Sequence, residues 1–251
     1  MKISIITATY NCATTLRDTI KSISRQTARQ HIEYIIIDGN SNDGTLQIIK
    51  DYSNQIDHWI SETDNGIYDA LNKGIQKATG DWIGFLHADD IFAHDHVIEK
   101  IIAAAENKEI NAIYGDLQYV QQLPPHKVIR QWTSQSFQPK LLKRGWMPPH
   151  PTVYITRNHY KTIGSFNTNY QISADYDLML RLFSNSQTKS LYINETLIKM
   201  KIGGASNQSI RNIIRKSTED YLALKRNRIG GLYSLAIKNI SKINQFFHSQ
   251  I

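Results

Sequence analysis

The chain alternates short runs rich in β-branched residues with helix-like segments over its first 114 residues. The runs at residues 2–9 (KISIITAT) and 32–37 (IEYIII) end in polar turns, as buried parallel strands do, and residues 11–26 between them predict a helix. Further strands are predicted at residues 58–61, 82–86 and 110–114. Because neighbouring parallel strands need crossover connections, this order predicts an α/β fold with a mainly parallel sheet flanked by helices.

The pattern changes after residue 115, where the strand-like pieces become shorter. Residues 117–122 and 127–133 predict strands on either side of a Pro-Pro turn, and residues 189–193 predict another. Residues 146–151 (WMPPHP) predict an irregular loop, because three prolines in six residues are incompatible with a helix interior or a central strand. Residues 175–183 predict a helix. The second half therefore builds a layer of a different kind.

Most of the net positive charge of the chain lies in the segment 207–251. The formal net charge is +7, and eight basic against two acidic side chains give this segment a net charge of +6. It predicts two helices separated by Gly230-Gly231, the second with apolar residues at helical spacing. We therefore divide the chain into a domain of residues 1–206 and a basic amphipathic helical tail of residues 207–251. The tail either packs on the domain or docks on an anionic membrane surface, to which each basic residue contributes about 1 kcal/mol.

Composition excludes several classes of protein. Hydrophobic residues make up 41% of the chain, which supports a globular core and argues against disorder. The single cysteine, Cys12, can form neither an internal disulfide nor a cysteine-based zinc site. No leader pattern and no run near the roughly 20 apolar residues of a membrane span is apparent. We expect a cytoplasmic protein, with the inner face of the cytoplasmic membrane as the place where the tail would dock.

Polar residues follow each predicted strand of the first half. They are Thr7 and Thr9 in the first strand, Asp38 after the second, Asp64 after the third, and Asp89 and Asp90 after the fourth. The carboxyl ends of parallel strands meet at one sheet edge, where open α/β sheets bind ligands. Carboxylates that converge there repel one another unless a hard divalent cation or sugar hydroxyls compensate them. The set predicts a site for such a ligand.

The individual motifs also have simpler interpretations. The stretch DGNSNDGT at residues 38–45 reads as a turn followed by a helix N-cap, which explains Ser41, Asp43 and Thr45. Its two glycines imitate half of a phosphate-binding loop, but Thr45 stands where that loop requires lysine, and no GxGxxG follows the first strand. Both nucleotide fingerprints therefore fail.

Taken in order, these residues resemble the inverting family-2 glycosyltransferases of GT-A fold. The matching stretches are ISIITATYN, IIIDGNSNDGT, SETDNGIYDALNKGIQKATGDWIGFLHADD, SADYDLMLRL and GGAS, spread over residues 2–206. The phrase SETDNGIYDALNKG looks like the branch that builds bacterial capsule, colanic-acid-type and O-antigen polysaccharides. The resemblance implies a nucleotide-sugar-binding half at residues 1–115 and an acceptor-binding half at residues 116–206.

The resemblance also implies roles for the residues at the sheet edge. The matching positions are Thr7, Thr9 and Asp38 for the nucleoside, Asp64 for base or ribose, and Asp89 and Asp90 for ribose and a bound Mn²⁺ or Mg²⁺, with Asp90 the expected metal ligand. His87 replaces the acidic or amide residue with which this motif usually begins. Zinc bound through His87, His94 and His96 is a weaker alternative, because carboxylates dominate the site.

Asp175 matches the general base of the family, although Ala174 replaces the frequent glutamate before it. A carboxylate within hydrogen-bond reach of an acceptor hydroxyl can take its proton during direct displacement, which inverts the sugar. Asp177 lies two residues on and points elsewhere on a helix, where Arg181 is its expected partner. Trp146 is a candidate for stacking on the acceptor, and His150 for contact with donor or acceptor.

These observations lead to one main prediction and two alternatives. The chain is expected to transfer a sugar from a nucleoside diphosphate sugar, UDP-sugar in first place, to an oligosaccharide or polyprenyl-diphosphate-linked acceptor. One alternative is a sugar-nucleotide nucleotidyltransferase, which lacks support because TYN stands where its Gly-rich basic loop belongs. The other is a non-catalytic nucleic-acid-binding protein. The nearly neutral domain argues against that alternative, since phosphate backbones need distributed basic contacts.

Overall fold

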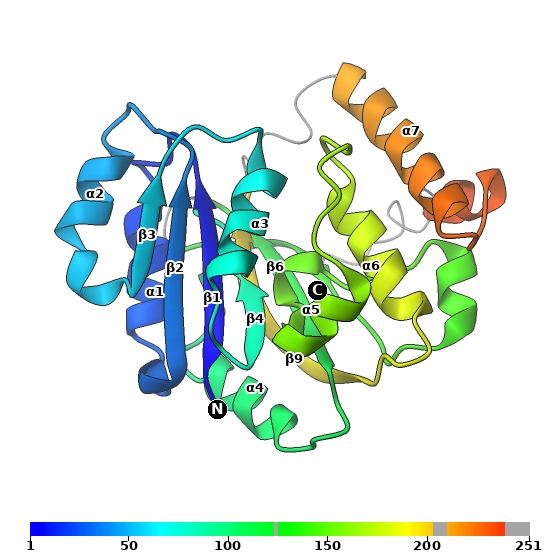
Figure 1. Cartoon of the computed structure of the whole chain (residues 1–251), viewed down its shortest axis with the longest axis horizontal. Helices are drawn as coiled ribbons and strands as arrows, with labels where there is room; N and C mark the ends of the chain where they lie inside the picture. Colours follow the sequence, from blue (N-terminus) through cyan, green and yellow to red (C-terminus); the bar gives the residue numbers. More distant parts are fainter. Residues whose placement is uncertain (123–124, 203–209, 239–251) are drawn as a thin grey trace.

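The first half of the chain forms a parallel sheet with helices on both faces (Figure 1). The computed structural model describes residues 1–122, 125–202 and 210–238. Four strands lie in the order β3-β2-β1-β4 and all pair in parallel. They are β1 (Ile3–Thr9), β2 (Ile32–Asp38), β3 (His58–Ser61) and β4 (Trp82–Phe85). All seven residues of β1 and of β2 are buried, because both faces of these strands are covered.

Alternate residues of each strand face two separate layers of helices. Ile3 and Ile5 pack on one face, and Ile6 and Ala8 pack on the other. The first face is covered by α1 (Leu16–Ser24), α2 (Thr45–Asp51) and α4 (Val97–Ala105). The second is covered by α3 (Ile67–Lys77), α5 (Arg157–Ile163) and α6 (Ala174–Ser184). The α/β architecture predicted from the sequence is therefore confirmed.

The rest of the sheet contains strands of mixed direction, most of them from the second half of the chain. Beyond β4 the order continues β8-β6-β9-β5, with β7 paired to β6. Only β6 and β9 pair in parallel here. The strands are β5 (Asp90–Phe92), β6 (Ala112–Val120), β7 (Val128–Trp132), β8 (Tyr154–Thr156) and β9 (Ser190–Lys201). Most neighbouring strands in this part of the sheet are thus antiparallel, unlike β1 to β4.

Several sequence expectations differ from these bounds. The two strands predicted at residues 110–114 and 117–122 are one strand, β6, whose pairing with β9 shifts register around Asp116. The strand predicted at residues 189–193 continues to Lys201 as β9, which crosses the sheet. The Pro-rich loop is irregular as predicted, apart from a short 3₁₀ turn at His150–Thr152. Strands β5 and β8 have three residues each, too few for a periodic signal.

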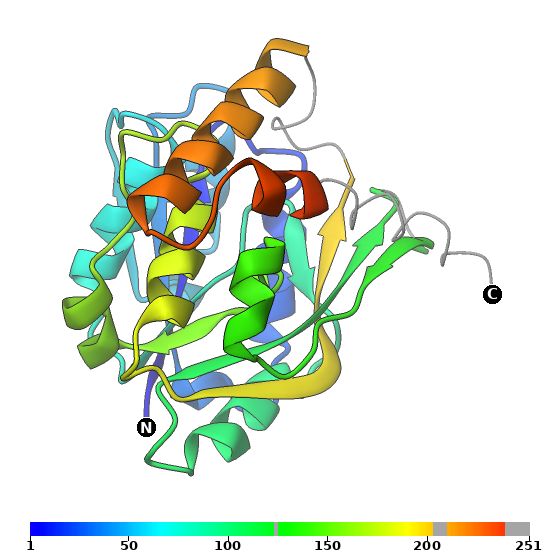
Figure 2. The same cartoon turned by 90° about the vertical axis from the view of Figure 1, so that its right-hand side faces the viewer.

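The described part of the tail packs on the domain beside α6. Helix α7 (Ile210–Arg226) runs along α6, and a second helical segment at residues 232–238 follows the break predicted at Gly230-Gly231 (Figure 2). Ala223 and Leu224 of α7 are fully buried in the same core as α6. The GGAS stretch and the tail beyond residue 238 lie outside the described residues. Among the helices that the structure describes, none is both long and apolar enough to cross a membrane.

Candidate functional site

Thr7, Thr9 and Asp38 hold the ends of the parallel strands together. Asp38 is fully buried, and its carboxylate accepts hydrogen bonds from Thr9 Oγ1 at 2.8 Å and from Ser61 Oγ at 2.7 Å. Thr7 Oγ1 donates to the carbonyl oxygen of Leu86 at 2.6 Å. The polar atoms of all three predicted residues are therefore used inside the protein. They fix the relative positions of β1, β2, β3 and the end of β4.

Asp64 lies directly beside this framework and is partly exposed. Its Oδ1 accepts a hydrogen bond from the backbone N–H of Gly66 at 2.8 Å. A Cβ atom at Gly39 would lie 2.6 Å from Asp64 Oδ2 and 3.4 Å from the Tyr10 ring, so only glycine allows this approach. Tyr10 is 64% exposed. The Tyr10 ring and the Asp64 carboxylate thus lie on either side of the Gly39 backbone. The contribution of Tyr10 had not been predicted from the sequence.

The loops after β1 and β2 are fastened to each other by side chains of the DGNSNDGT stretch. Ser41 Oγ accepts from the backbone N–H of Asn11 at 2.9 Å, Thr45 Oγ1 from that of Cys12 at 2.8 Å, and Asp43 Oδ2 from that of Ala13 at 3.0 Å. Asp43 Oδ1 also accepts from the N–H of Thr45, the first residue of α2. These residues serve the structure, in agreement with the turn interpretation of this stretch.

Asp89 and Asp90 occupy different environments after β4. Asp90 begins β5, is fully buried, and has no hydrogen-bond partner for either carboxylate oxygen among the described residues. Burial first, and the charge of Asp89 second, raise its pKa well above the ordinary value. Asp89 is partly exposed, and its charge acts on both Cys12 and His87. Asp89 is therefore the acid of the pair that can meet a ligand arriving from outside.

The rings of His87 and His150 lie side by side close to Asp89. Their ring centroids are 5.9 Å apart, and His150 also packs on Phe85 and Phe166 at 5.4 Å and 5.5 Å. Burial, followed by the neighbouring His87, lowers the pKa of His150 to about 3. Burial also lowers the pKa of His87, although the charges of Asp89 and Asp175 oppose that shift. Both imidazoles are therefore neutral at neutral pH.

No zinc site is assembled by the histidines. His94 Nε2 lies 3.0 Å from Glu195 Oε1, and His96 Nδ1 lies 3.0 Å from Glu99 Oε2. Within residues 1–122, 125–202 and 210–238, no group of three or more His, Cys, Asp or Glu side chains is arranged to hold a metal. The alternative of zinc bound through His87, His94 and His96 finds no support in this geometry.

Asp175 lies in the first turn of α6. Its Oδ1 accepts from the N–H of Tyr176 at 2.8 Å and lies 3.4 Å from Tyr68 Oη. It is partly exposed, and its charge acts on His87, as does that of Asp89. Asp177, by contrast, is buried and binds Arg181 Nε at 2.9 Å, which confirms the expected pair. Of these two acids, Asp175 is therefore the one that remains partly exposed.

Glu219 of the tail positions the turn that leads into Asp175. Its carboxylate accepts hydrogen bonds from three successive backbone N–H groups, those of Gln171 at 3.1 Å, Ile172 at 2.8 Å and Ser173 at 2.9 Å. The side chain is 8% exposed. Charge-assisted hydrogen bonds of this kind are among the stronger ones in proteins. The sequence alone showed Glu219 only as one of two acids in a basic tail, so this role had not been predicted.

Trp146 has a packing role in the structure. Its ring contacts those of Tyr114, Phe137 and Phe183 at centroid distances of 5.9, 5.8 and 5.3 Å. Three neighbouring rings account for the placement of this side chain, which is partly buried. Trp146 is consequently a part of the aromatic core under α6, and stacking on an acceptor is not needed to explain it.

Comparisons with known proteins show the family of the chain. The family model described as "Glycosyl transferase family 2" matches residues 4–166. The chain belongs to this family. A Mycobacterium tuberculosis relative, "PGL/p-HBAD biosynthesis glycosyltransferase", is 31% identical over 209 residues, which cover 81% of this chain and 78% of that protein. The protein is thus a family-2 glycosyltransferase, as the sequence resemblance implies.

Solved structures confirm the GT-A-like fold. S. aureus TarS 1–349 in complex with UDP-GlcNAc has a TM-score of 0.72 at 14% identity, and covers 99% of this chain and 74% of that one. The mannosyltransferase PcManGT from Pyrobaculum calidifontis, in complex with GDP-Man and Mn²⁺, has a TM-score of 0.66 at 14% identity, covering 100% and 76%. The resemblance to the capsule and O-antigen branch stays a prediction, because the mycobacterial relatives are described by PGL/p-HBAD biosynthesis.

Proposed function

We propose that this glycosyltransferase moves a sugar from a nucleoside diphosphate sugar to an acceptor hydroxyl by direct, inverting displacement. The observation that carries the proposal is a line of contacts between the two halves of the chain. Asp175 Oδ1 lies 3.4 Å from Tyr68 Oη, and ring contacts lead from Tyr68 through Phe166 and His150 to His87, two residues before Asp89. Two partly exposed carboxylates are therefore connected by one set of packed rings. One can serve the leaving diphosphate and the other the incoming alcohol.

The donor nucleotide is proposed to bind beside β1, β2 and β3. Tyr10 offers an exposed ring for a planar base, and Asp64 offers a carboxylate for base or ribose hydrogen bonds. Thr7, Thr9 and Asp38 act from below by fixing the strand ends. The structural neighbours bind UDP-GlcNAc and GDP-Man, which supports a nucleotide sugar as donor. We favour UDP as its nucleotide.

The residues after β4 fit a Mn²⁺ or Mg²⁺ ion. Such ions are held by one or two carboxylates together with substrate phosphates, so a complete protein cage is not required. We assign the direct contact to Asp89, which is partly exposed, and place Asp90 behind it as a buried supporting acid. This reverses the order of importance that the sequence suggests. When bound, the ion supplies positive charge where the diphosphate leaves.

Asp175 is proposed as the general base. Its carboxylate accepts the proton of the acceptor hydroxyl while that oxygen attacks the anomeric carbon from the face opposite the diphosphate. Glu219 keeps the turn at residues 171–173 in place, so Asp175 is presented at a fixed position. The buried ring of His150 and the partly buried ring of His87 pack together beside Asp89, and we infer that they limit the entry of water.

The acceptor is proposed to enter from residues 116–206, with the donor in residues 1–115. We propose an oligosaccharide on a polyprenyl diphosphate, as in bacterial surface polysaccharide synthesis. The tail contributes exposed apolar side chains for peripheral contact with an anionic membrane, at Ile213, Ile214, Leu222, Leu232 and Tyr233. Co-sedimentation with anionic vesicles tests this contact. Loss of binding in the variant Leu232→Ser/Tyr233→Ser supports it, and equal binding refutes it.

Point variants are preferable here to removal of the tail. Lys238 Nζ forms a buried ion pair with Asp220 at 2.8 Å and lies over the Tyr176 ring of α6. Truncation after residue 206 would remove these contacts together with Glu219, and would damage the domain itself. A truncated chain that failed to bind vesicles would therefore say nothing about the membrane.

A donor screen tests the proposed function directly. Thermal shift is measured with UDP-, GDP- and dTDP-sugars, each with and without Mn²⁺. We expect one nucleotide family to raise the melting temperature, and Mn²⁺ to increase the shift, because a ligand that binds only the folded state stabilises it. No shift with any donor at millimolar concentration, in the presence of Mn²⁺, would contradict the proposal.

A further inference from the structure

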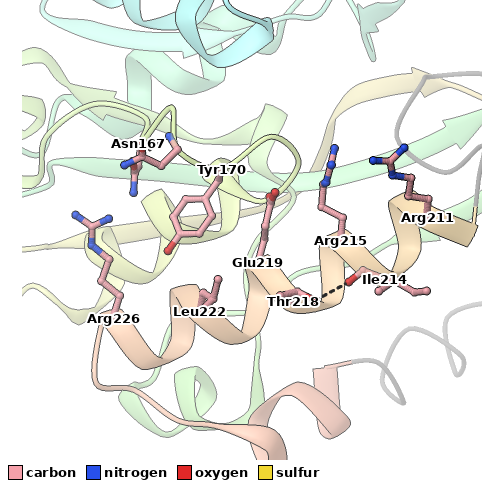
Figure 3. A pocket seen from close by; sticks show the side chains of 10 residues that line it. Asn167, Tyr170, Arg211, Ile214, Arg215, Thr218, Glu219, Leu222 and Arg226 are labelled. Atoms are coloured by element: carbon pink, nitrogen blue, oxygen red, sulfur yellow. Dashed lines mark hydrogen bonds between the residues drawn. The ribbon is translucent and has the colours of Figure 1, made fainter.

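A cavity separate from the strand ends lies between α7 and the loop at residues 167–170. It has a volume of about 910 Å³ and opens along one face of the helix (Figure 3). Its wall includes Glu219, the residue that anchors the turn before Asp175. The cavity is therefore joined to the candidate base by one hydrogen-bonded turn.

Three arginines of α7 line this cavity. Arg211, Arg215 and Arg226 lie four and eleven residues apart, which places them on one face of a helix, and Figure 3 shows them along the same wall. Within the described residues, none of the three forms an ion pair with a carboxylate. Glu219 cannot neutralise them fully, because it carries one negative charge against their three positive charges. The arrangement leaves an excess of positive charge that suits an anion.

The opposite wall offers hydrogen-bond donors for the same anion. Asn167 Nδ2 is buried and has no hydrogen-bond partner among the described residues. Tyr170, which is 7% exposed, directs its ring into the cavity from the same loop. An amide donor without a partner costs free energy unless a ligand accepts its proton. Phosphate oxygens meet that requirement, and arginine is the side chain best matched to them.

The cavity also has an apolar side. Ile214 is 63% exposed and Leu222 is 49% exposed, and both line it between the arginines. Its volume exceeds what a phosphate group alone would fill. Apolar side chains next to guanidinium groups match a molecule in which a charged head is joined to a hydrocarbon. Free nucleotides and neutral sugars lack this combination.

We propose that this arginine groove (Arg211, Arg215 and Arg226) binds an amphiphilic, polyprenyl-type acceptor, with its diphosphate at Arg211 and Arg215, which lie one helical turn apart. The assignment rests on the proposed transfer reaction, for which it names the acceptor's anchoring site. With the diphosphate held by α7, the saccharide attached to it extends past the turn at residues 171–173 toward Asp175. Glu219 then links acceptor binding to the position of the base.

Binding of a polyprenyl diphosphate in neutral detergent micelles to the full-length protein tests the proposal. The variant Arg211→Gln/Arg215→Gln removes the two guanidinium groups assigned to the diphosphate. Lys225→Gln/Arg228→Gln is the matched control, since it removes the same charge from exposed tail positions outside the cavity wall. We expect the dissociation constant to rise about tenfold or more in the first variant, through lost charge-assisted hydrogen bonds, and less than about twofold in the control. Equal changes in both variants would overturn the proposal.

Two further measurements are needed. The first distinguishes an acceptor diphosphate from a lipid headgroup as the ligand, and the second distinguishes failure of this proposal from failure of the proposed transfer reaction. Vesicles of phosphatidylglycerol present the same chemistry as bilayer headgroups. If the groove variant loses vesicle binding but keeps its affinity for the polyprenyl diphosphate, the groove is a membrane contact and the acceptor assignment is wrong. UDP binding with Mn²⁺ should be equal in wild type and both variants. If the wild-type protein binds no donor but still binds the polyprenyl diphosphate through the groove, the proposed transfer reaction is wrong and the proposed binding site is supported.

Discussion

The ends of the parallel strands and the junction of α6 with α7 build their halves of the site in different ways. At the strand ends, each polar residue lies within a few positions of its own strand, and hydrogen bonds among Thr9, Asp38 and Ser61 fix the framework. At the junction, Glu219 binds the turn that precedes Asp175, and it lies 44 positions further along the chain than Asp175. The first region shows that sheet topology can bring polar side chains from separate strands together. The second shows that the segment before the proposed base is held by a distant helix.

The largest expected effect concerns the base at the junction. Asp175→Asn keeps the size of the side chain and removes the proton acceptor, so transfer should fall roughly 100- to 10,000-fold. Donor binding at the strand ends should be unchanged. The measurement is turnover together with calorimetric titration of UDP, with the exposed Asp51→Asn as control. Unchanged turnover would mean that the two regions do not divide the work in this way.

The next effect distinguishes the two acids after β4. Asp89→Asn should abolish the Mn²⁺-dependent part of UDP binding. Loss of a direct metal ligand should lower metal affinity by more than the roughly 10- to 100-fold that is typical when a residue supporting a ligand is changed. Asp90→Asn should cost less, since burial raises the pKa of this carboxyl and an amide fits the same space. UDP titrations with and without Mn²⁺ check both. A greater loss in the Asp90 variant would restore Asp90 as the principal ligand.

Glu219→Gln tests the support that the tail gives to the base. A neutral amide accepts the three N–H groups of residues 171–173 less well, so the free energy of unfolding should fall by about 1–3 kcal/mol. The turnover number should fall while the KM of the donor stays constant, because the donor binds at the other region. Ser217→Ala, at a partly exposed position of α7 outside the cavity wall, is the control. A change in donor KM alone would place Glu219 elsewhere in the mechanism.

The smallest effect is expected for Gly39→Ala at the strand ends. The added Cβ would meet Asp64 Oδ2 at 2.6 Å, and the partly exposed carboxylate would move aside. Affinity for UDP should fall about two- to tenfold with little change in turnover at saturation. Gly231→Ala, whose Cβ would meet only Lys225 at ordinary contact distance, is the matched control. An unaltered affinity for UDP would mean that Asp64 does not contact the nucleotide.

The same contrast explains what the sequence could and could not predict. Asp38, Asp64 and Asp89 could be predicted to lie at one edge of the sheet, because each follows a strand visible in the sequence and the topology rule brings the strand ends together. The pair Asp177–Arg181 was found because a four-residue spacing on a helix sets their distance. Local spacing is the information that these predictions share.

Contacts between distant segments carried no such signal. Nothing near Glu219 in the sequence indicates the turn at residues 171–173, and nothing near Trp146 indicates Phe137 or Phe183. The depth of Asp90 could not be foreseen either, because β5 has three residues and pairs with a strand more than a hundred positions away. Packing across the whole fold decides these features.

The anomeric configuration of the product tests the central claim most directly. Once the donor screen supplies an accepted nucleotide sugar, proton NMR of the first transfer product gives the coupling constant of its new glycosidic linkage. An accessible base opposite the leaving diphosphate predicts inversion, so an α-linked donor should give a β-linked product. An α-linked product, formed with retention, would contradict the roles assigned to Asp89 and Asp175.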